Sequence, residues 1–114
     1  MSSRLKSDLF VSAYLRRCAG VNVPAMLRRR GAEDAGAIYI KIDHLDGMAS
    51  LYVPAPADQM AEQGIDRVFT RIMTRVEAGD VEARMQREIK YDPDLWFVEI
   101  EERGDRSFLD EVPS

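Results

Sequence analysis

The sequence has almost none of the side chains that build metal centres and redox sites. Its 114 residues include one cysteine, Cys18, and one histidine, His44. A single cysteine excludes an internal disulfide and any metal cluster held by several cysteines, and it is typical of a protein from a reducing compartment. Because a lone cysteine beside Leu15 and Ala19 is more often packed than reactive, we interpret Cys18 as a core residue.

Long apolar runs are also missing. No stretch approaches the roughly 18 apolar residues that a membrane-spanning helix needs, and residues 1–8 lack the apolar core of a secretory signal. We therefore expect a cytoplasmic protein without a membrane partner. Glycine and proline are few, at 7 and 5 residues, and 46% of the residues are hydrophobic. This composition predicts a single globular domain over residues 1–114.

Familiar enzyme signatures are absent as well. The sequence contains no glycine-rich phosphate loop, no serine elbow, no His-Glu-x-x-His string and no paired cysteines. We therefore expect no cofactor and no tightly held metal ion. This absence favours a protein that acts by binding over one that acts by chemistry.

Hydrophobic periodicity predicts an α+β fold with the element order α-β-β-β-α-α-β. The expected sheet is small, mixed or antiparallel, with about four strands and with the helices packed on one face. The predicted elements are a helix capped by Ser7 or Asp8 and ending near Gly20, strands at Asn22–Arg28, Ala37–Asp43 and Met48–Val53, helices that begin after Asp66 and Asp80, and a final strand at Leu95–Arg103.

Two of these elements, the strand at residues 22–30 and the final strand, bear on function. Residues 22–30 alternate as in a strand, although Pro24 and Gly31 also suit the two ends of a short helix. We favour a strand, which Pro24 would confine to a sheet edge. The final strand follows a helical excursion long enough to give it a parallel neighbour, and we expect its Trp96 to share the core with Ile38, Ile40 and Ile42.

The segment between Pro54 and Gly79 is expected to be a linker followed by a helix. The run Pro54–Gly64 holds prolines with small and polar residues, which is typical of a linker. After it, an apolar stripe at helical spacing and three arginines four residues apart indicate a helix that ends at Gly79. The stripe consists of Val68, Phe69, Ile72, Met73 and Val76, and the arginines are Arg67, Arg71 and Arg75.

Several short strings of the sequence resemble one bacterial family. The most specific of them is Phe/Tyr-Asp-Pro-Asp-Leu-Trp, and the matching residues are Asp8–Arg17, Gly36–Ile38, Leu45–Gly47, Tyr91–Trp96 and Val98–Glu101. In these strings the chain is similar to the family known as domain of unknown function 1491, over nearly its whole length. The resemblance implies one compact cytoplasmic domain, and it implies no activity, cofactor or catalytic residue.

Charge is unevenly distributed along the chain. Residues 1–41 hold eight basic and three acidic side chains, whereas residues 42–114 hold eight basic and seventeen acidic ones. Thirteen of the sixteen basic residues are arginine, which pairs with carboxylates in a fixed two-pronged geometry. We expect much of this charge to be neutralised within the fold, with Arg28 and Arg30 meeting Glu99 and Glu101 across the sheet.

Some arginines are candidates for binding. If the first helix lies beside the strand at residues 22–30, five guanidinium groups can gather into a patch that holds a phosphate or a partner's carboxylates. These are Arg16, Arg17, Arg28, Arg29 and Arg30. The alternative is a solvated face with no binding role. Because the net charge is −4, nucleic acid is a disfavoured partner.

Two hypotheses about function follow. The first is a non-enzymatic module that binds another protein, or a second copy of itself, through a sheet edge or through the arginines. The second is a small hydrolase or metal-dependent enzyme that uses His44 with Asp43 and Asp46, or the carboxylates of Asp92 and Asp94. Aspartate side chains commonly bond backbone N–H groups in turns, which accounts for both aspartate pairs without catalysis. The first hypothesis is therefore favoured.

Overall fold

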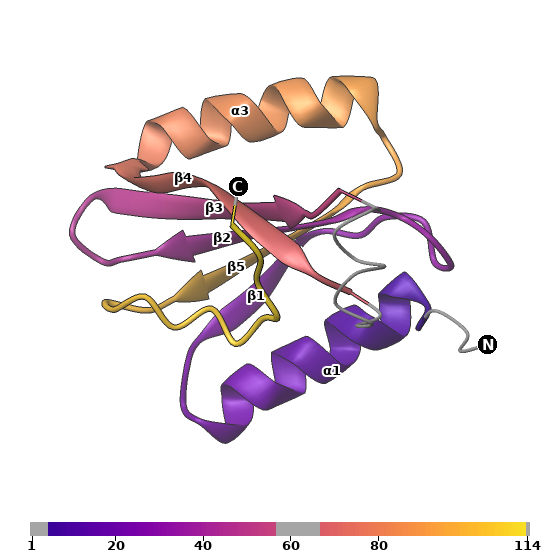
Figure 1. The fold of residues 1–114 in the computed structure, drawn as a ribbon, viewed down its shortest axis with the longest axis horizontal. Coiled ribbons are helices and arrows are strands. Elements are labelled where there is room, and N and C mark those ends of the chain that lie inside the picture. Colours follow the sequence, from indigo (N-terminus) through magenta and orange to yellow (C-terminus); the bar gives the residue numbers. More distant parts are fainter. Residues whose placement is uncertain (1–4, 57–66, 114) are drawn as a thin grey trace.

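A mixed five-stranded sheet with one helix on each face makes up the described part of the chain (Figure 1). The computed structural model describes residues 5–56 and 67–113. Its elements are α1 (Ser7–Gly20), β1 (Ala25–Arg29), β2 (Ile38–Asp43), β3 (Met48–Pro54), β4 (Phe69–Glu77), α3 (Ala78–Tyr91) and β5 (Trp96–Glu101). The α+β class is confirmed.

The final strand lies inside the sheet, between the first two strands. The strand order is β1-β5-β2-β3-β4, and β5 runs parallel to β2 while every other neighbouring pair is antiparallel. The excursion through β4 and α3 carries the chain back across the sheet, which a parallel connection requires. The edge strand predicted at residues 22–28 is present as β1, which begins at Ala25 and ends at Arg29, and β5 has the parallel neighbour that was expected.

The segment predicted as a helix after Asp66 is instead the strand β4, so the sheet has five strands and the order is α-β-β-β-β-α-β. Every second residue from Val68 to Val76 is β-branched, and this alternation suits a strand that pairs along β3. Gly79 lies in the first turn of α3 and ends no helix. Asp66 and the linker from residue 57 onward lie outside the described residues.

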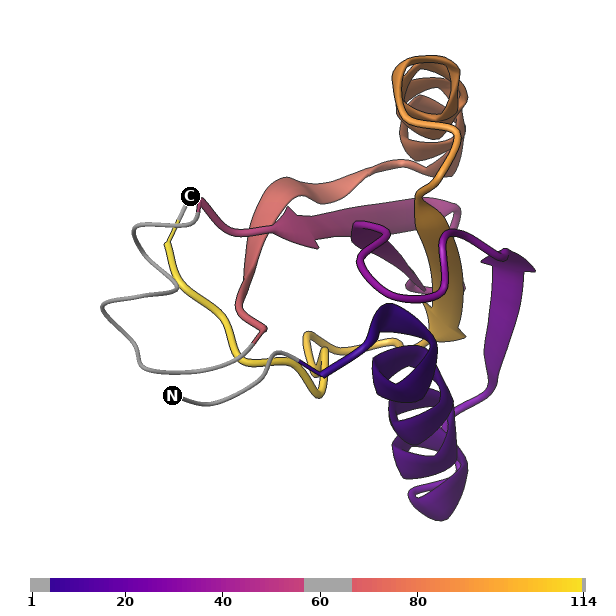
Figure 2. The same ribbon diagram turned by 90° about the vertical axis from the view of Figure 1, so that its right-hand side faces the viewer.

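The two helices cover opposite faces of the sheet, as Figure 2 shows. Trp96 and the three isoleucines of β2 are buried against α1, as expected, whereas Phe97 and Leu51 are buried on the side of α3. The expectation that both helices share one face is wrong. Strands β2 and β5 present apolar side chains on both faces, and only a helix on each side removes both sets from water.

The loop between β1 and β2 lies against the residues that precede β5. A Cβ atom on Gly31 would stand 2.3 Å from the Asp94 carbonyl oxygen, and one on Gly36 would stand 2.4 Å from it. The Ala32 N–H donates to the same oxygen at 2.8 Å, and the Trp96 indole N–H donates to the Ala32 carbonyl at 2.8 Å. Two glycines therefore permit a backbone approach that any side chain would prevent.

The same loop receives the beginning of α1. The backbone N–H groups of Ser7 and Asp8 donate to the carbonyls of Asp34 and Glu33, each at 3.1 Å, and the Ser7 hydroxyl donates to the Gly36 carbonyl at 2.7 Å. These bonds satisfy N–H groups that a helix start leaves without intrahelical partners. The predicted side-chain cap is wrong, because no side chain caps α1 and the loop carbonyls take that role.

Four charged side chains join β1 to the centre of the sheet and to α3. Arg28 donates to Glu82 at 2.7 Å and to Glu99 at 2.5 Å, and Lys41 donates to Glu82 at 2.7 Å. Lys41 and Glu99 are neighbours on adjacent strands and are almost buried, at 6% and 9% exposed. Two cations balance two anions in this cluster, which is the condition for keeping charge inside a protein.

We predict that Trp96→Ala lowers the free energy of unfolding by about 3–5 kcal/mol, because it opens a cavity and removes the indole bond to Ala32. Trp96 is 1% exposed. Tyr91→Ala is the matched control, since Tyr91 is 89% exposed and its loss should cost less than about 0.5 kcal/mol. Urea unfolding measures both variants, and an unchanged midpoint for Trp96→Ala would contradict the burial of this residue.

The ion cluster predicts that the stability of the fold depends on pH through the carboxylate of Glu82. Hydrogen bonds from Arg28, with those from Lys41, lower the pKa of Glu82 to about 2 from its ordinary value of 4.5. Its pairing therefore stabilises the fold fully above pH 4.5, and that stability is lost as the pH falls through 2. Glu82→Gln should be destabilising at neutral pH and should converge with the wild type toward pH 2.

Chemical denaturation at a series of pH values measures this convergence. Glu33→Gln is the control, because Glu33 is exposed on the loop before β2 and lies outside the cluster. A constant difference between Glu82→Gln and the wild type at every pH would show that the carboxylate of Glu82 does not stabilise the fold through its charge.

Candidate functional site

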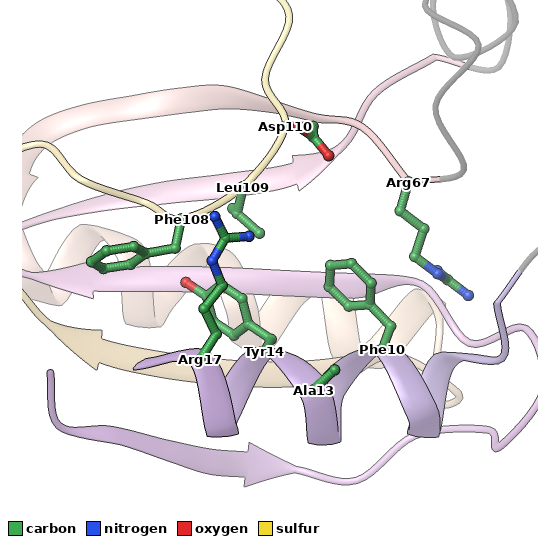
Figure 3. A pocket seen from close by; sticks show the side chains of 8 residues that line it. All are labelled: Phe10, Ala13, Tyr14, Arg17, Arg67, Phe108, Leu109 and Asp110. Carbon is green, nitrogen blue, oxygen red and sulfur yellow. The ribbon is translucent and has the colours of Figure 1, made fainter. Parts of the chain in front are cut away.

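The five candidate arginines do not gather into one patch. Arg17 lies on the side of α1 that faces residues 108–110 (Figure 3), whereas Arg28 lies on the opposite face of the sheet with Glu82 and Glu99. Arg16 is exposed on α1. The expected cross-strand pair between Arg28 and Glu99 is present, and it is the structural cluster described above. Arg28 is therefore engaged within the fold.

The two remaining arginines lie at the end of β1, beside the loop that precedes β5. The Arg29 guanidinium donates to the Pro93 carbonyl at 2.7 Å, and its Nε is buried with no hydrogen-bond partner. Arg30 is exposed, and its guanidinium lies 5.1 Å from the centre of the Trp96 ring. Arg30 was expected to meet Glu101, and it stacks on Trp96 instead.

His44 is fixed inside the protein. Its Nδ1 lies 2.8 Å from the Glu102 carbonyl and its Nε2 lies 2.9 Å from Ser50 Oγ, while Ser50 accepts the Arg75 N–H at 3.0 Å. A carbonyl only accepts, so Nδ1 carries a proton and donates to the Glu102 carbonyl, while Nε2 is engaged with the Ser50 hydroxyl. His44 and Ser50 are 2% and 1% exposed. This arrangement stabilises the bulge between β3 and β4 and leaves neither ring nitrogen for a metal ion.

The carboxylates near His44 serve their own turn. Asp43 accepts the Leu45 N–H at 2.8 Å and Asp46 accepts the Met48 N–H at 3.0 Å, and both bonds close short Asx turns. Within residues 5–56 and 67–113, no three histidine, cysteine or acidic side chains converge as a metal-binding group.

The acidic turn before β5 is also accounted for by structure. Asp92 accepts the Asp94 N–H at 3.1 Å, and the Asp94 carbonyl receives the Ala32 N–H. The Asp94 side chain is exposed, and Leu95 beside it is fully buried. The Asp-Pro-Asp-Leu-Trp string thus forms a turn that places Leu95 and Trp96 in the two cores.

The outer edge of β1 is the clearest surface for contact. The Glu101 N–H donates to the Pro24 carbonyl, so the backbone groups of Met26 also face β5, and those of Ala25 and Leu27 point away from the sheet. Met26 is 47% exposed and Leu27 is 38% exposed. Sheet edges with exposed apolar side chains are templates for pairing with another strand.

The other edge of the sheet is partly covered. Residues of the C-terminal segment pair with the first residue of β4: the Phe69 N–H donates to the Asp110 carbonyl at 2.8 Å, and the Val112 N–H donates to the Phe69 carbonyl at 2.9 Å. The two edges therefore differ, and β1 has its backbone groups more accessible than the start of β4 does.

A groove runs beside β1, between that strand and α3. Its volume is about 240 Å³, and it is lined by Arg28, Arg29, Glu82, Met85, Gln86, Ile89 and Phe97. The groove adds apolar and charged side chains to the open backbone edge, so a strand paired with β1 would also find side-chain contacts. Sequence reasoning identified the edge and Arg29 but missed the groove, because its walls come from segments about 60 residues apart.

The described helices include none that is long and apolar enough to cross a membrane.

Comparisons with known proteins agree with this fold. A solution structure of a protein from A. tumefaciens has a TM-score of 0.82 and 38% sequence identity, with 98% of each chain covered. The 1.87 Å crystal structure of a DUF1491 family protein from Caulobacter crescentus has a TM-score of 0.79 and 31% identity, with 98% of this chain and 99% of that chain covered. Among curated proteins, none matches. The family model described as "Protein of unknown function (DUF1491)" matches residues 5–110. The chain belongs to the DUF1491 family.

Proposed function

We propose that this chain is a non-enzymatic protein-interaction module of the bacterial cytoplasm, and that it binds an extended segment of a partner protein along the outer edge of β1. The observation that carries the proposal is the open backbone of Ala25 and Leu27 beside the exposed side chains of Met26 and Leu27. Strand addition at such an edge gives affinity through main-chain hydrogen bonds. The buried, unpaired Cys18 fits a reducing compartment.

The charge along the edge indicates the chemistry of the partner. Arg29 and Arg30 follow the exposed Met26 and Leu27 after one intervening residue, and the Arg29 guanidinium donates to the Pro93 carbonyl. Arg30 is exposed, and a partner carboxylate that reaches its guanidinium would make a charge-assisted hydrogen bond. The partner segment should therefore combine apolar residues with acidic ones, at the alternating positions that a strand presents.

The same charge favours a different protein over a second copy of this chain. Two β1 strands placed edge to edge would bring four arginines, Arg29 and Arg30 of each copy, into one small interface, because Arg28 is already paired with Glu82 and Glu99. Like charges in such a contact are destabilising, whereas an acidic strand neutralises them. Pro24 and the bulge between Leu27 and Arg29 interrupt the edge, and such features restrict unselective pairing.

We predict that an eight-residue peptide of alternating valine and glutamate binds at β1 and that the matched valine–lysine peptide does not. Titration followed by ¹⁵N NMR should shift the amide signals of residues 25–30 first, and added salt should weaken binding because the contact is exposed. Arg30→Glu should weaken binding about fivefold, since it replaces an attraction with a repulsion.

Arg16→Glu is the matched control, because it makes the same charge change on α1, away from the edge. It should leave the affinity for the acidic peptide within about twofold of the wild type. Equal binding of both peptides, or signal changes centred outside β1 and its groove, would contradict the proposal. Light scattering of the chain alone tests the self-association alternative, for which we expect a monomer.

A further inference from the structure

A second pocket lies on the opposite side of the molecule from the groove beside β1, between α1 and residues 108–110 (Figure 3). Its volume is about 120 Å³. Four of its lining residues are spaced three, four and seven positions from the first, so they form one stripe along α1. These are Phe10, Ala13, Tyr14 and Arg17, and the other lining residues are Arg67, Phe108, Leu109 and Asp110.

The walls of this pocket are aromatic and are held in place. The rings of Phe10 and Tyr14 are stacked, with centroids 6.3 Å apart and planes 9° from parallel. The Tyr14 hydroxyl donates to the Ser107 carbonyl at 2.7 Å, which joins the C-terminal segment to α1. Burial raises the pKa of Tyr14 well above its ordinary value, so this donor keeps its proton at neutral pH.

The backbone at the rim of the pocket is strained. Phe108 has a φ of 61°, in the left-handed region that aromatic residues seldom adopt. The segment tolerates this conformation because it is fixed on both sides, by Tyr14 before Phe108 and by pairing with Phe69 after it. Strain of this kind is concentrated at ligand sites, where it positions a side chain. Here it places the Phe108 ring beside the opening.

Charged side chains stand at the pocket. Arg17 and Asp110 are exposed, whereas Arg67 is held by bonds within the fold. Arg67 is 5% exposed, its Nη2 donates to the Leu5 carbonyl at 2.8 Å, and its guanidinium lies 5.6 Å from the Phe10 ring centre. Arg17 is exposed, and Figure 3 shows its side chain extending from α1 toward Phe108 and Leu109. The exposed guanidinium of Arg17 can hold an anion, and the aromatic walls favour an apolar body.

We propose that this pocket binds a small monocarboxylic acid with a branched apolar group, whose carboxylate is held by Arg17. A planar guanidinium binds a carboxylate through two parallel hydrogen bonds. A cavity of about 150 Å³ holds one benzene molecule, so this pocket of about 120 Å³ accepts a group of four or so carbon atoms. Asp110 repels a second carboxylate, so the pocket selects monocarboxylates over dicarboxylates.

This inference is independent of the proposed function, because the pocket and the β1 edge share no residue. Inorganic phosphate carries charge but has no apolar body to cover the rings of Phe10 and Tyr14. A neutral hydrocarbon covers the rings but leaves Arg17 without an anion. The aromatic rings and the guanidinium of Arg17 are therefore both satisfied only by a ligand that carries an apolar group and an anionic group.

The test is an NMR titration of the full chain with 3-methylbutanoate. A ligand of this size should bind with a Kd on the order of 1 mM and should shift the signals of Phe10, Tyr14 and Phe108. The neutral amide, 3-methylbutanamide, should bind at least about tenfold more weakly, because a charge-assisted hydrogen bond is lost. Methylsuccinate should also bind more weakly, and Asp110→Asn should reduce that difference.

Two pairs of variants locate the site. Arg17→Gln should weaken binding of 3-methylbutanoate about tenfold, whereas Arg16→Gln, on the neighbouring exposed residue, should leave it unchanged. Ala13→Leu should fill the pocket and abolish binding, whereas Ser12→Leu should have no effect, because Ser12 does not line it. Leucine has nearly the helix propensity of alanine, so Ala13→Leu should fold normally, and its melting curve checks this.

Equal affinity for the acid and its amide would overturn the proposal, since the arginine would then have no role. Binding that Arg16→Gln weakens as much as Arg17→Gln would also overturn it, because that result indicates attraction to the general charge of α1. If Ala13→Leu folds and still binds 3-methylbutanoate, the ligand lies outside the pocket and the proposal is wrong.

Discussion

The close approach of Gly31 and Gly36 to the Asp94 carbonyl is the constraint on which the rest of the structure depends. Through this contact one loop holds the start of β5, and through its other carbonyls it holds the start of α1. A side chain at either glycine would push the loop away from Asp94, and Trp96 would lose its bond to Ala32. The Asp-Pro-Asp-Leu-Trp string that typifies the sequence therefore has a role in packing.

The position of β5 determines where contact with other molecules is favourable. Because β5 is inserted between β1 and β2, the short strand β1 becomes the edge of the sheet. The cluster of Arg28, Lys41, Glu82 and Glu99 neutralises the charge behind that edge. Arg29 and Arg30 lie beyond the cluster and keep their charge at the surface, next to exposed apolar residues. The edge thus combines an open backbone, apolar area and positive charge.

Particular residues show what the sequence could and could not predict. The alternation of Ile38, Ile40 and Ile42 identified β2, and the helix predicted after Asp80 is present as α3. The segment of β4 was predicted as a helix because its arginines are four residues apart. Residues at this spacing also lie on the same face of a strand, and the alternation of β-branched residues was the better signal. The separation of Arg17 from Arg28 was not predictable, because it depends on which face of the sheet α1 covers.

The central claim is that the outer edge of β1 is open, and amide hydrogen exchange tests it most directly. The N–H of Met26 faces β5 and should exchange slowly, whereas those of Ala25 and Leu27 point away from the sheet and should exchange quickly. Alternating protection along β1 is the result that the structure predicts. Slow exchange at Ala25 and Leu27 as well as at Met26 would show that the edge is covered, and it would contradict the account.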